Sequence, residues 1–161
     1  GYAATSLDRL KNIMLYILEK CGEVWYTKMN KLLFYIDFVS YREQGTAMTG
    51  LAYKAISYGP VPDRWDKVYS EFPEIMQELR PVGEYTGSVL KSNVNSDTSL
   101  FSDVELKIMD MVCSSLGSCT ARALSELSHK EEAWITNKEA HSYIPYDSAF
   151  SLVASGRLPA I

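Results

Sequence analysis

Residues 32–38 place the tightest constraint on the fold. They read Leu-Leu-Phe-Tyr-Ile-Asp-Phe, an apolar and aromatic run with one carboxylate. Apolar positions recur at helical spacing around this run, which predicts a helix over 27–44 that Thr27 caps and Gly45 ends. Its carboxylate, Asp37, fits either a general base or a buried acceptor for a neighbouring Tyr, Lys or backbone donor. The acceptor is favoured, because buried polar groups are normally hydrogen-bonded.

The rest of the chain predicts a mostly helical fold with little sheet. Capping boxes at Ser102-x-x-Glu105 and Ser128-x-x-Glu131 open two of the helices. Helices are expected over 7–20, 62–72, 74–79, 103–116, 121–127, 128–134 and 146–154. Strands are expected over 51–58 and 84–94, paired as a hairpin or at an edge, and 24–27 is a short strand or a packed turn. The fold class is therefore α+β, one domain over 1–161 with a small antiparallel sheet or hairpin and frayed ends at 1–6 and 155–161.

Composition narrows the class of protein. The 161 residues are 47% hydrophobic and 22% charged, enough for one domain with its own core, and no run is long enough for a membrane span. The net charge is −4 and neither half of the chain has the basic excess typical of nucleic-acid binding. Three cysteines fit a reducing cytoplasm better than a disulfide framework. The leading Gly without Met suggests a piece of a longer chain.

No catalytic or metal-binding motif is found. The pairs Cys113-x₅-Cys119 and His129-x₁₁-His141 do not match zinc-ligand spacings. Cys119 and His129 fall on consecutive predicted helices without an oxyanion loop, and no glycine-rich phosphate loop is present. We therefore expect no enzyme activity, no cofactor and no metal.

Two binding interpretations remain open. The first is a helix-turn-helix whose second helix presents Lys28, Asn30 and Lys31 to DNA, although simple packing is favoured. The second concerns the aromatic residues around Tyr58-Gly59-Pro60-Val61-Pro62. This stiff turn is either a pre-organised binding surface or a connector that resets the chain direction. The two interpretations of the turn have comparable weight.

An ordered set of motifs resembles the SocA-like, or Panacea, domain family. The set comprises Lys31-Leu32-Leu33-Phe34-Tyr35-Ile36-Asp37-Phe38, Tyr41-Arg42-Glu43-Gln44-Gly45, Thr49-Gly50-Leu51-Ala52-Tyr53, Tyr58-Gly59-Pro60-Val61-Pro62, Ser128-His129-Lys130-Glu131-Glu132-Ala133-Trp134 and Ile144-Pro145-Tyr146. The resemblance covers about residues 7–150. It implies an antitoxin domain of a bacterial or phage toxin–antitoxin system that neutralises a cognate protein toxin by direct contact in the cytoplasm. Alternatives are a DNA-binding regulator, an adaptor that delivers a toxin to a protease, and a hydrolase that uses Asp37 or His129.

The resemblance and the aromatic turn together give the expected site residues. Partner contact is assigned to Tyr53, Tyr58, Gly59, Pro60, Pro62 and Trp65, with Lys28, Lys31 and Arg42 as a polar rim. Motif residues that either bind or hold the fold are Lys31, Tyr35, Asp37, Tyr41, Gly45, Gly50, His129 and Trp134. The last two are expected to anchor the C-terminal helices to the core. The partner is a toxin, DNA is bound only through a separate module, a homodimer is allowed, and no membrane is involved.

Overall fold

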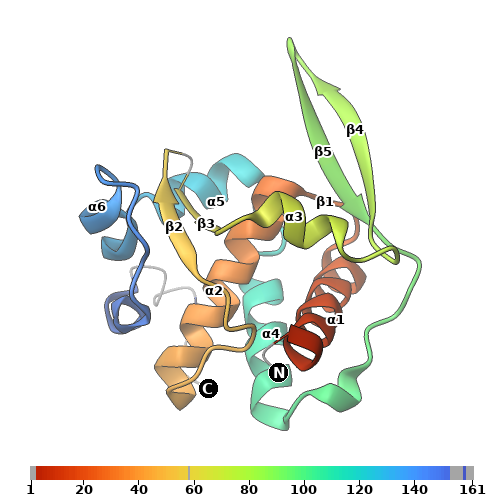
Figure 1. The fold of residues 1–161 in the computed structure, drawn as a ribbon, viewed down its shortest axis with the longest axis horizontal. Helices are drawn as coiled ribbons and strands as arrows, with labels where there is room; N and C mark the ends of the chain where they lie inside the picture. Colours follow the sequence, from red (N-terminus) through yellow and green to blue (C-terminus); the bar gives the residue numbers. More distant parts are fainter. Residues whose placement is uncertain (1–2, 58, 153–157, 159–161) are drawn as a thin grey trace.

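The computed structural model describes residues 3–57, 59–152 and 158, and it is mostly helical, as expected for an α+β domain (Figure 1). The described residues form six α-helices, five strands and two short 3₁₀ helices. In chain order these are α1 (Ala3–Cys21), β1 (Val24–Trp25), α2 (Tyr26–Gln44), β2 (Tyr53–Ile56), β3 (Gly59–Pro62), α3 (Trp65–Ser70), β4 (Met76–Val82), β5 (Tyr85–Lys91), η1 (Thr98–Leu100), α4 (Asp103–Leu116), α5 (Ala121–Ser128), α6 (Glu132–Asn137) and η2 (Tyr146–Ser151).

Helix α2 is the centre of the molecule. Its residues 29–40 are all buried, polar residues included. It contacts α1 and α4 on one side and β3, α5 and η2 on the other, which Figure 1 shows as helices and strands arranged around the orange segment. A helix whose apolar residues are spread over every face is stable only when neighbours cover it on every face. The apolar run of the sequence therefore dictates this arrangement.

The strands form two separate antiparallel sheets. One has three strands in the order β1-β5-β4, and the other pairs β2 with β3. In the first sheet Val24 lies opposite Leu90, and Val82 lies opposite Tyr85 across a two-residue turn. Residues 142–144 add backbone hydrogen bonds to β2, from Ala55 N to Ser142 O and from Ile144 N to Tyr53 O. The C-terminal segment thus covers the outer side of β2.

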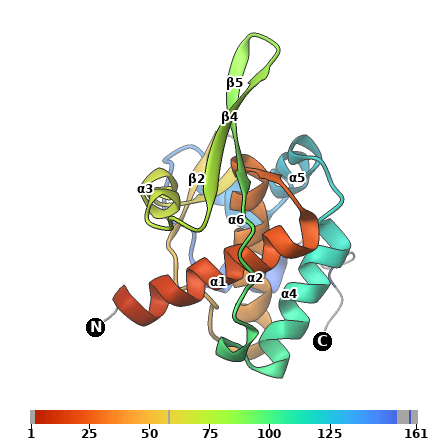
Figure 2. The same ribbon diagram turned by 90° about the vertical axis from the view of Figure 1, so that its right-hand side faces the viewer.

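The β4–β5 hairpin, residues 76–91, is the most conspicuous feature of the outline. Figures 1 and 2 both show its two strands projecting away from the body of the molecule. Its base is held by the core, because Val89 and Leu90 are buried. Its tip, residues 81–86, is exposed on both strands. The hairpin is therefore anchored at one end and free of the body at the other.

Several expected boundaries are confirmed. Gly22 and Gly45 follow the ends of α1 and α2 with positive φ, as left-handed C-caps. Ser102 and Glu105 form the full capping box of α4, and the Thr120 hydroxyl caps α5. Residues 3–6, expected as part of a frayed start, are assigned to α1, and the expected frayed residues 1–2, 155–157 and 159–161 lie outside the described part of the chain.

Other sequence-based expectations are wrong, and pairing between strands is the reason. Pro62 ends strand β3 opposite Tyr53 and does not begin a helix. The segment expected as a helix over 74–79 becomes part of β4, because β5 lies alongside it. The strand around 84–94 pairs with β4 and β1, not with residues 51–58.

Two expected caps are also wrong. Helix α2 starts at Tyr26 with no side-chain cap, so Thr27 lies within the helix. Ser128 ends α5, and its hydroxyl donates back to Ser125 O at 2.8 Å, so it does not open the next helix. The last expected helix is the shorter η2, Tyr146–Ser151.

Candidate partner-binding surface

Most of the turn expected to contact a partner faces the core. Tyr53 is 1% exposed, and its ring packs edge-on against Phe34 and Phe38 with centroids 5.7 and 5.8 Å away. The β3 residues Gly59, Pro60 and Pro62 are buried as well, because β3 lies against α2. The expectation of an exposed surface is therefore wrong for these four residues. Tyr58 and the Trp65 side chain lie outside the described part of the structure.

Asp37 is a buried acceptor, as favoured from the sequence. Its carboxylate accepts the backbone N–H of Met48 at 2.9 Å and of Thr49 at 2.8 Å, the Thr49 hydroxyl, and the Tyr53 hydroxyl at 2.7 Å. Burial raises the pKa of Asp37, and these hydrogen bonds offset part of that rise. The carboxylate fixes the loop after α2, which contains the positive-φ residue Gly50, onto the helix.

Two motifs that are about 100 residues apart meet in a second buried polar cluster. The Tyr35 hydroxyl, on α2, donates to Glu131 Oε1 at 3.1 Å, and both residues are 0% exposed. Lys31, one turn earlier on α2, is 1% exposed, and burial lowers its pKa to about 7. Its Cε and the Ser128 hydroxyl lie 2.8 and 2.6 Å from where a Cβ of Gly59 would be. Ser128 and Glu131 belong to one of the family-like motifs of the sequence, but neither is among the predicted site residues.

The remaining motif residues hold the C-terminal segment in place. The Trp134 indole N–H donates to Ile56 O at 2.6 Å, and its ring stacks on His129 with centroids 4.1 Å apart. Trp134 is half-buried against the core, which confirms the expected anchoring. The Tyr41 hydroxyl donates to Asp147 at 3.0 Å. These contacts attach α5, α6 and η2 to α2 and β2.

The expected polar rim and the DNA-reading helix are both wrong in this structure. Lys28 and Arg42 lie near opposite ends of α2, and Lys31 is buried between them. The Lys28 ammonium donates to Gly117 O, and the Arg42 guanidinium pairs with Glu43 at 2.9 Å. Asn30 is 1% exposed and accepts the Tyr69 hydroxyl. A recognition helix needs such side chains in solvent, and here they hold the fold.

The β4–β5 hairpin instead carries the densest group of exposed apolar side chains. Of the ten large hydrophobic residues that are exposed in the described part of the chain, four lie on it: Met76 (42%), Leu79 (73%), Val82 (49%) and Tyr85 (80%). Val82 and Tyr85 are directly paired and so share one face. Leu79 pairs with Ser88 and points to the other face. The outer part of the hairpin therefore carries exposed apolar side chains on both faces.

Charged side chains on β4 and β5 pair with one another and with Glu23. Glu78 accepts from Lys91 at 2.8 Å and from Arg80 at 2.9 Å, and Arg80 also pairs with Glu23 at 2.8 Å. The hydrogen bonds from Lys91 and Arg80 lower the pKa of Glu78 to about 2. Because these pairs are exposed, they add little stability. They leave Glu84 as the charged side chain of the turn.

Trp25 supports the hairpin from one side. It pairs with Val89 from β1, and its ring lies over Gly87, where an added Cβ would be 2.7 Å from the indole. Gly87 is thus a close-approach glycine, and Trp25 covers the proximal half of the face that carries Val82 and Tyr85 further out. The hairpin is braced at its base and leaves its distal residues for contact.

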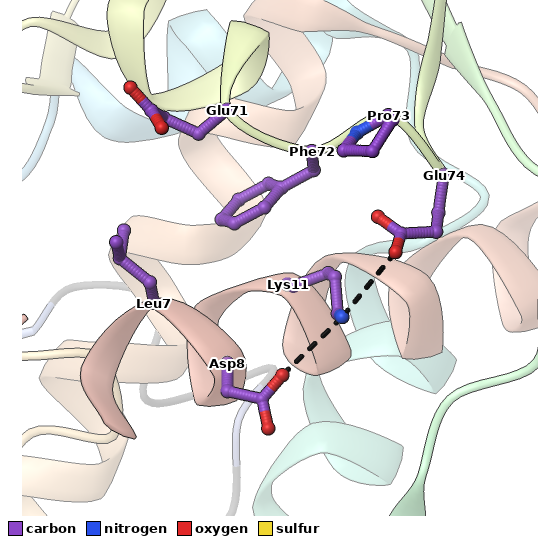
Figure 3. A pocket seen from close by; sticks show the side chains of 7 residues that line it. All are labelled: Leu7, Asp8, Lys11, Glu71, Phe72, Pro73 and Glu74. Atoms are coloured by element: carbon purple, nitrogen blue, oxygen red, sulfur yellow. Dashed lines mark ion pairs between the residues drawn. The ribbon is translucent and has the colours of Figure 1, made fainter. Parts of the chain in front are cut away.

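A cleft lies beside the foot of this hairpin. It has a volume of about 550 Å³ between α1 and the segment that leads into β4, lined by Leu7, Asp8, Lys11, Glu71, Phe72, Pro73 and Glu74. Figure 3 shows Lys11 between the two carboxylates that it pairs with, Asp8 at 3.4 Å and Glu74 at 3.6 Å. The lining is mixed apolar and acidic. In the described part of the chain, no three His, Cys, Asp or Glu side chains converge as metal ligands.

Comparisons with known proteins show a similarity to one protein family. A family model described as "Antitoxin SocA-like, Panacea domain" matches residues 29–135, more than half of the chain and the part from α2 into α6. The comparisons find no match among curated proteins or solved structures. None of the described helices is long and apolar enough to cross a membrane.

Proposed function

Because the chain belongs to the antitoxin SocA-like, Panacea domain family, we propose that it neutralises a protein toxin by direct contact through the β4–β5 hairpin. Binding alone achieves this, so the domain acts without catalysis and without a cofactor. We place the complex in the bacterial cytoplasm. The single observation that carries the choice of surface is the group of exposed apolar residues on the projecting hairpin.

The side chains of the hairpin suit a small, well-defined contact. Tyrosine buries a large area at low entropic cost and is enriched among residues that dominate binding energy. Tyr85 and Leu79 are the two most exposed large hydrophobic residues in the described part of the chain. They stand on opposite faces of a braced hairpin, so a toxin groove that encloses the tip would contact both. Such a pre-organised element loses little freedom on binding.

The edge of the hairpin argues for contact through side chains and not through strand addition. β4 is the outer strand of its sheet and contains Pro81, which has no N–H to donate. Arg80 and Glu78, both on β4, carry charge beside it. Proline and charge on an edge strand are devices that prevent pairing with another chain. The apolar side chains remain as the source of affinity.

The test is neutralisation in cells that co-express the toxic product of the neighbouring reading frame. The double variant Leu79→Ser/Tyr85→Ser should remain folded, with a melting temperature near that of the parent, and should no longer restore growth. Val104→Ser/Ile135→Ser, at residues 42% and 48% exposed on α4 and α6, is the matched control and should still restore growth. A folded hairpin variant that neutralises as well as the parent would rule this surface out.

A second arm separates sequestration from delivery to a protease. Purified domain and purified toxin should form a complex, and the toxin should lose its activity, with no protease present. The Leu79→Ser/Tyr85→Ser variant should lose both effects. Inhibition that appears only after a protease is added would favour the adaptor role over direct neutralisation.

A further inference from the structure

The cleft between α1 and the segment before β4 has a negatively charged lining. Its charged groups are three carboxylates, from Asp8, Glu71 and Glu74, and one ammonium, from Lys11, which leaves a net charge of −2. Lys11 Nζ lies 3.4 Å from Asp8 Oδ1 and 3.6 Å from Glu74 Oε1, so it balances only part of this charge (Figure 3). A cleft lined by one sign of charge attracts ions of the opposite sign. The lining therefore favours a cationic ligand.

Glu74 also has an acceptor that nothing in the described part of the chain uses. Its Oε2 is buried and receives no hydrogen bond from any described residue. A buried acceptor without a donor is uncommon, because it keeps the full cost of leaving water. The side chain as a whole is 34% exposed, and the terminal torsion of a glutamate is soft, so this oxygen can turn toward a donor in the cleft.

The apolar part of the lining selects among cations. Leu7 and Pro73 line the cleft with the Phe72 ring, which Figure 3 shows reaching toward Leu7 from the opposite wall. A guanidinium is flat and weakly hydrated, and it donates two N–H groups to a carboxylate while its face lies on an apolar or aromatic surface. A metal ion needs several converging oxygen ligands, and no such group is found among the described residues. The cleft thus suits an arginine side chain.

The cleft is continuous with the foot of the hairpin. The Ser92 hydroxyl, directly after β5, donates to Glu74 O at 2.6 Å, and Ile75 N–H donates to Phe72 O at 3.0 Å. These bonds fix the wall that carries Glu74. Strand β4 has seven residues, so the hairpin is about 20 Å long at about 3.3 Å per residue. A small domain is about 30 Å across, so a partner on the hairpin reaches the cleft.

We propose that this cleft binds an arginine side chain of the toxin that contacts the hairpin. The guanidinium donates to Glu74 and Asp8, and its methylene stem lies along Leu7 and Phe72. Lys11 competes with it for the same two carboxylates. The proposal rests on the proposed function for the source of the arginine, whereas the preference for a guanidinium follows from the lining alone.

The first test uses the purified chain and N-acetyl-arginine amide, followed by backbone amide shifts in NMR spectra. Shifts at residues 7–11 and 71–76 should change and saturate in the millimolar range, and added salt should weaken the binding because it screens the charges. N-acetyl-citrulline amide has nearly the same shape without the charge and should not bind. Equal binding of the two probes, or no localised shifts with the arginine probe, would overturn the proposal.

Three variants locate the probe. Glu74→Gln keeps the shape of the side chain and should weaken binding about tenfold, the usual effect of losing a hydrogen bond to a charged group. Lys11→Met should strengthen binding, since the competing ammonium is gone, whereas a purely structural role for Lys11 predicts no gain. Glu126→Gln, at a 65% exposed carboxylate on α5, is the matched control and should bind like the parent. Parental affinity in Glu74→Gln would contradict the proposal.

The second test uses the purified toxin. Glu74→Gln should weaken the complex about tenfold, as it does the probe, whereas Leu79→Ser/Tyr85→Ser should abolish the complex. A toxin that binds Glu74→Gln as tightly as the parent would overturn the arginine contact and leave the hairpin proposal intact. A toxin that still binds the hairpin variant would overturn the proposed function, and the probe titration would still decide whether the cleft takes a guanidinium.

Discussion

Gly59 shows how a single residue is fixed by residues far from it. The space beside its Cα is taken by the Lys31 and Ser128 side chains, which come from α2 and α5. Its φ of 107° is also unfavourable for any residue with a Cβ. The glycine is therefore required twice, by its backbone conformation and by the Lys31 and Ser128 side chains that pack beside it.

Gly59→Ala should lower the free energy of unfolding by about 2–4 kcal/mol, because backbone strain and overpacking add. Gly45→Ala is the matched control. Gly45 has a φ of 75° with no atom within 4 Å of an added Cβ, so strain alone should cost about 1 kcal/mol. Urea unfolding of both variants measures the difference. Equal losses would show that the contact with Lys31 and Ser128 is not restrictive.

Lys31 should make stability depend on pH above neutrality. Burial lowers its folded pKa to about 7, while an unfolded lysine titrates near 10.4, so between these values the unfolded chain binds the extra proton. The penalty of the buried charge is thus complete below pH 7 and is relieved as the pH rises. The free energy of unfolding should increase from pH 7 to 10, by at most about 1.4 kcal/mol per pH unit.

Lys31→Met should remove this slope and should be at least as stable as the parent at pH 7. Lys107→Met, at an exposed position of α4, serves as the control and should retain the parental slope. Denaturant unfolding at a series of pH values gives the comparison. A parental slope in Lys31→Met would assign the pH dependence to another group.

At the scale of elements, local capping and long-range pairing contribute differently. Helix α4 begins with a complete capping box, in which the Ser102 hydroxyl accepts from Glu105 N and the Glu105 carboxylate accepts from Ser102 N. Helix α2 begins with no side-chain cap, and its buried stretch starts one turn later, at Met29. The β4–β5 hairpin depends on both local and long-range contacts. Its turn is local, but its base depends on Trp25 and β1.

Ser102→Ala should lower the free energy of unfolding by about 1 kcal/mol, the usual cost of losing a helix N-cap. Thr27→Ala is the contrasting variant. Thr27 lies inside α2 and makes no capping hydrogen bond, so its loss should change stability by less than about 0.5 kcal/mol. Thermal or urea unfolding ranks the two. The reverse order would mean that Thr27 caps α2 in solution.

For the whole molecule, the C-terminal third closes the core built by the first. Residues of α5, α6 and η2 reach back to α2 and β2 through Glu131, Trp134 and Tyr146. The Tyr146 hydroxyl donates to Leu51 O, and its ring stacks on Phe38 with centroids 4.7 Å apart. These contacts leave the hairpin free on the side away from them (Figures 1 and 2).

Trp134→Ala should lower the free energy of unfolding by about 2–4 kcal/mol, since it removes a half-buried ring and the hydrogen bond to Ile56 O. Trp134→Phe should keep most of the packing and lose less. Phe150→Ala, at a ring that is 67% exposed, is the control and should cost under about 1 kcal/mol. If Trp134→Ala were as mild as the control, α6 would not be anchored through this residue.

The sequence by itself determined the features that depend on near neighbours. The central helix, its Gly45 stop and the Ser102 capping box were predictable, because helical periodicity and caps involve residues within one or two turns. Asp37 was also predictable as a buried acceptor, because a carboxylate inside an apolar helix needs hydrogen-bond donors. The ordered motifs also indicated the family that the match over 29–135 shows.

Only the tertiary structure decided which surfaces remain free. The Gly59-Pro60-Val61-Pro62 segment looks like an exposed turn in sequence, but it is buried because α2 and the C-terminal helices enclose it. The local pattern predicts a helix over 74–79, but residues 76–82 form a strand because β5 pairs with them. Burial and strand pairing depend on residues distant in the chain, and a local pattern carries no information about them. The hairpin joins two consecutive strands, but β1 holds its base, so the position of the hairpin, and with it the proposed binding surface, depends on a contact distant in the chain.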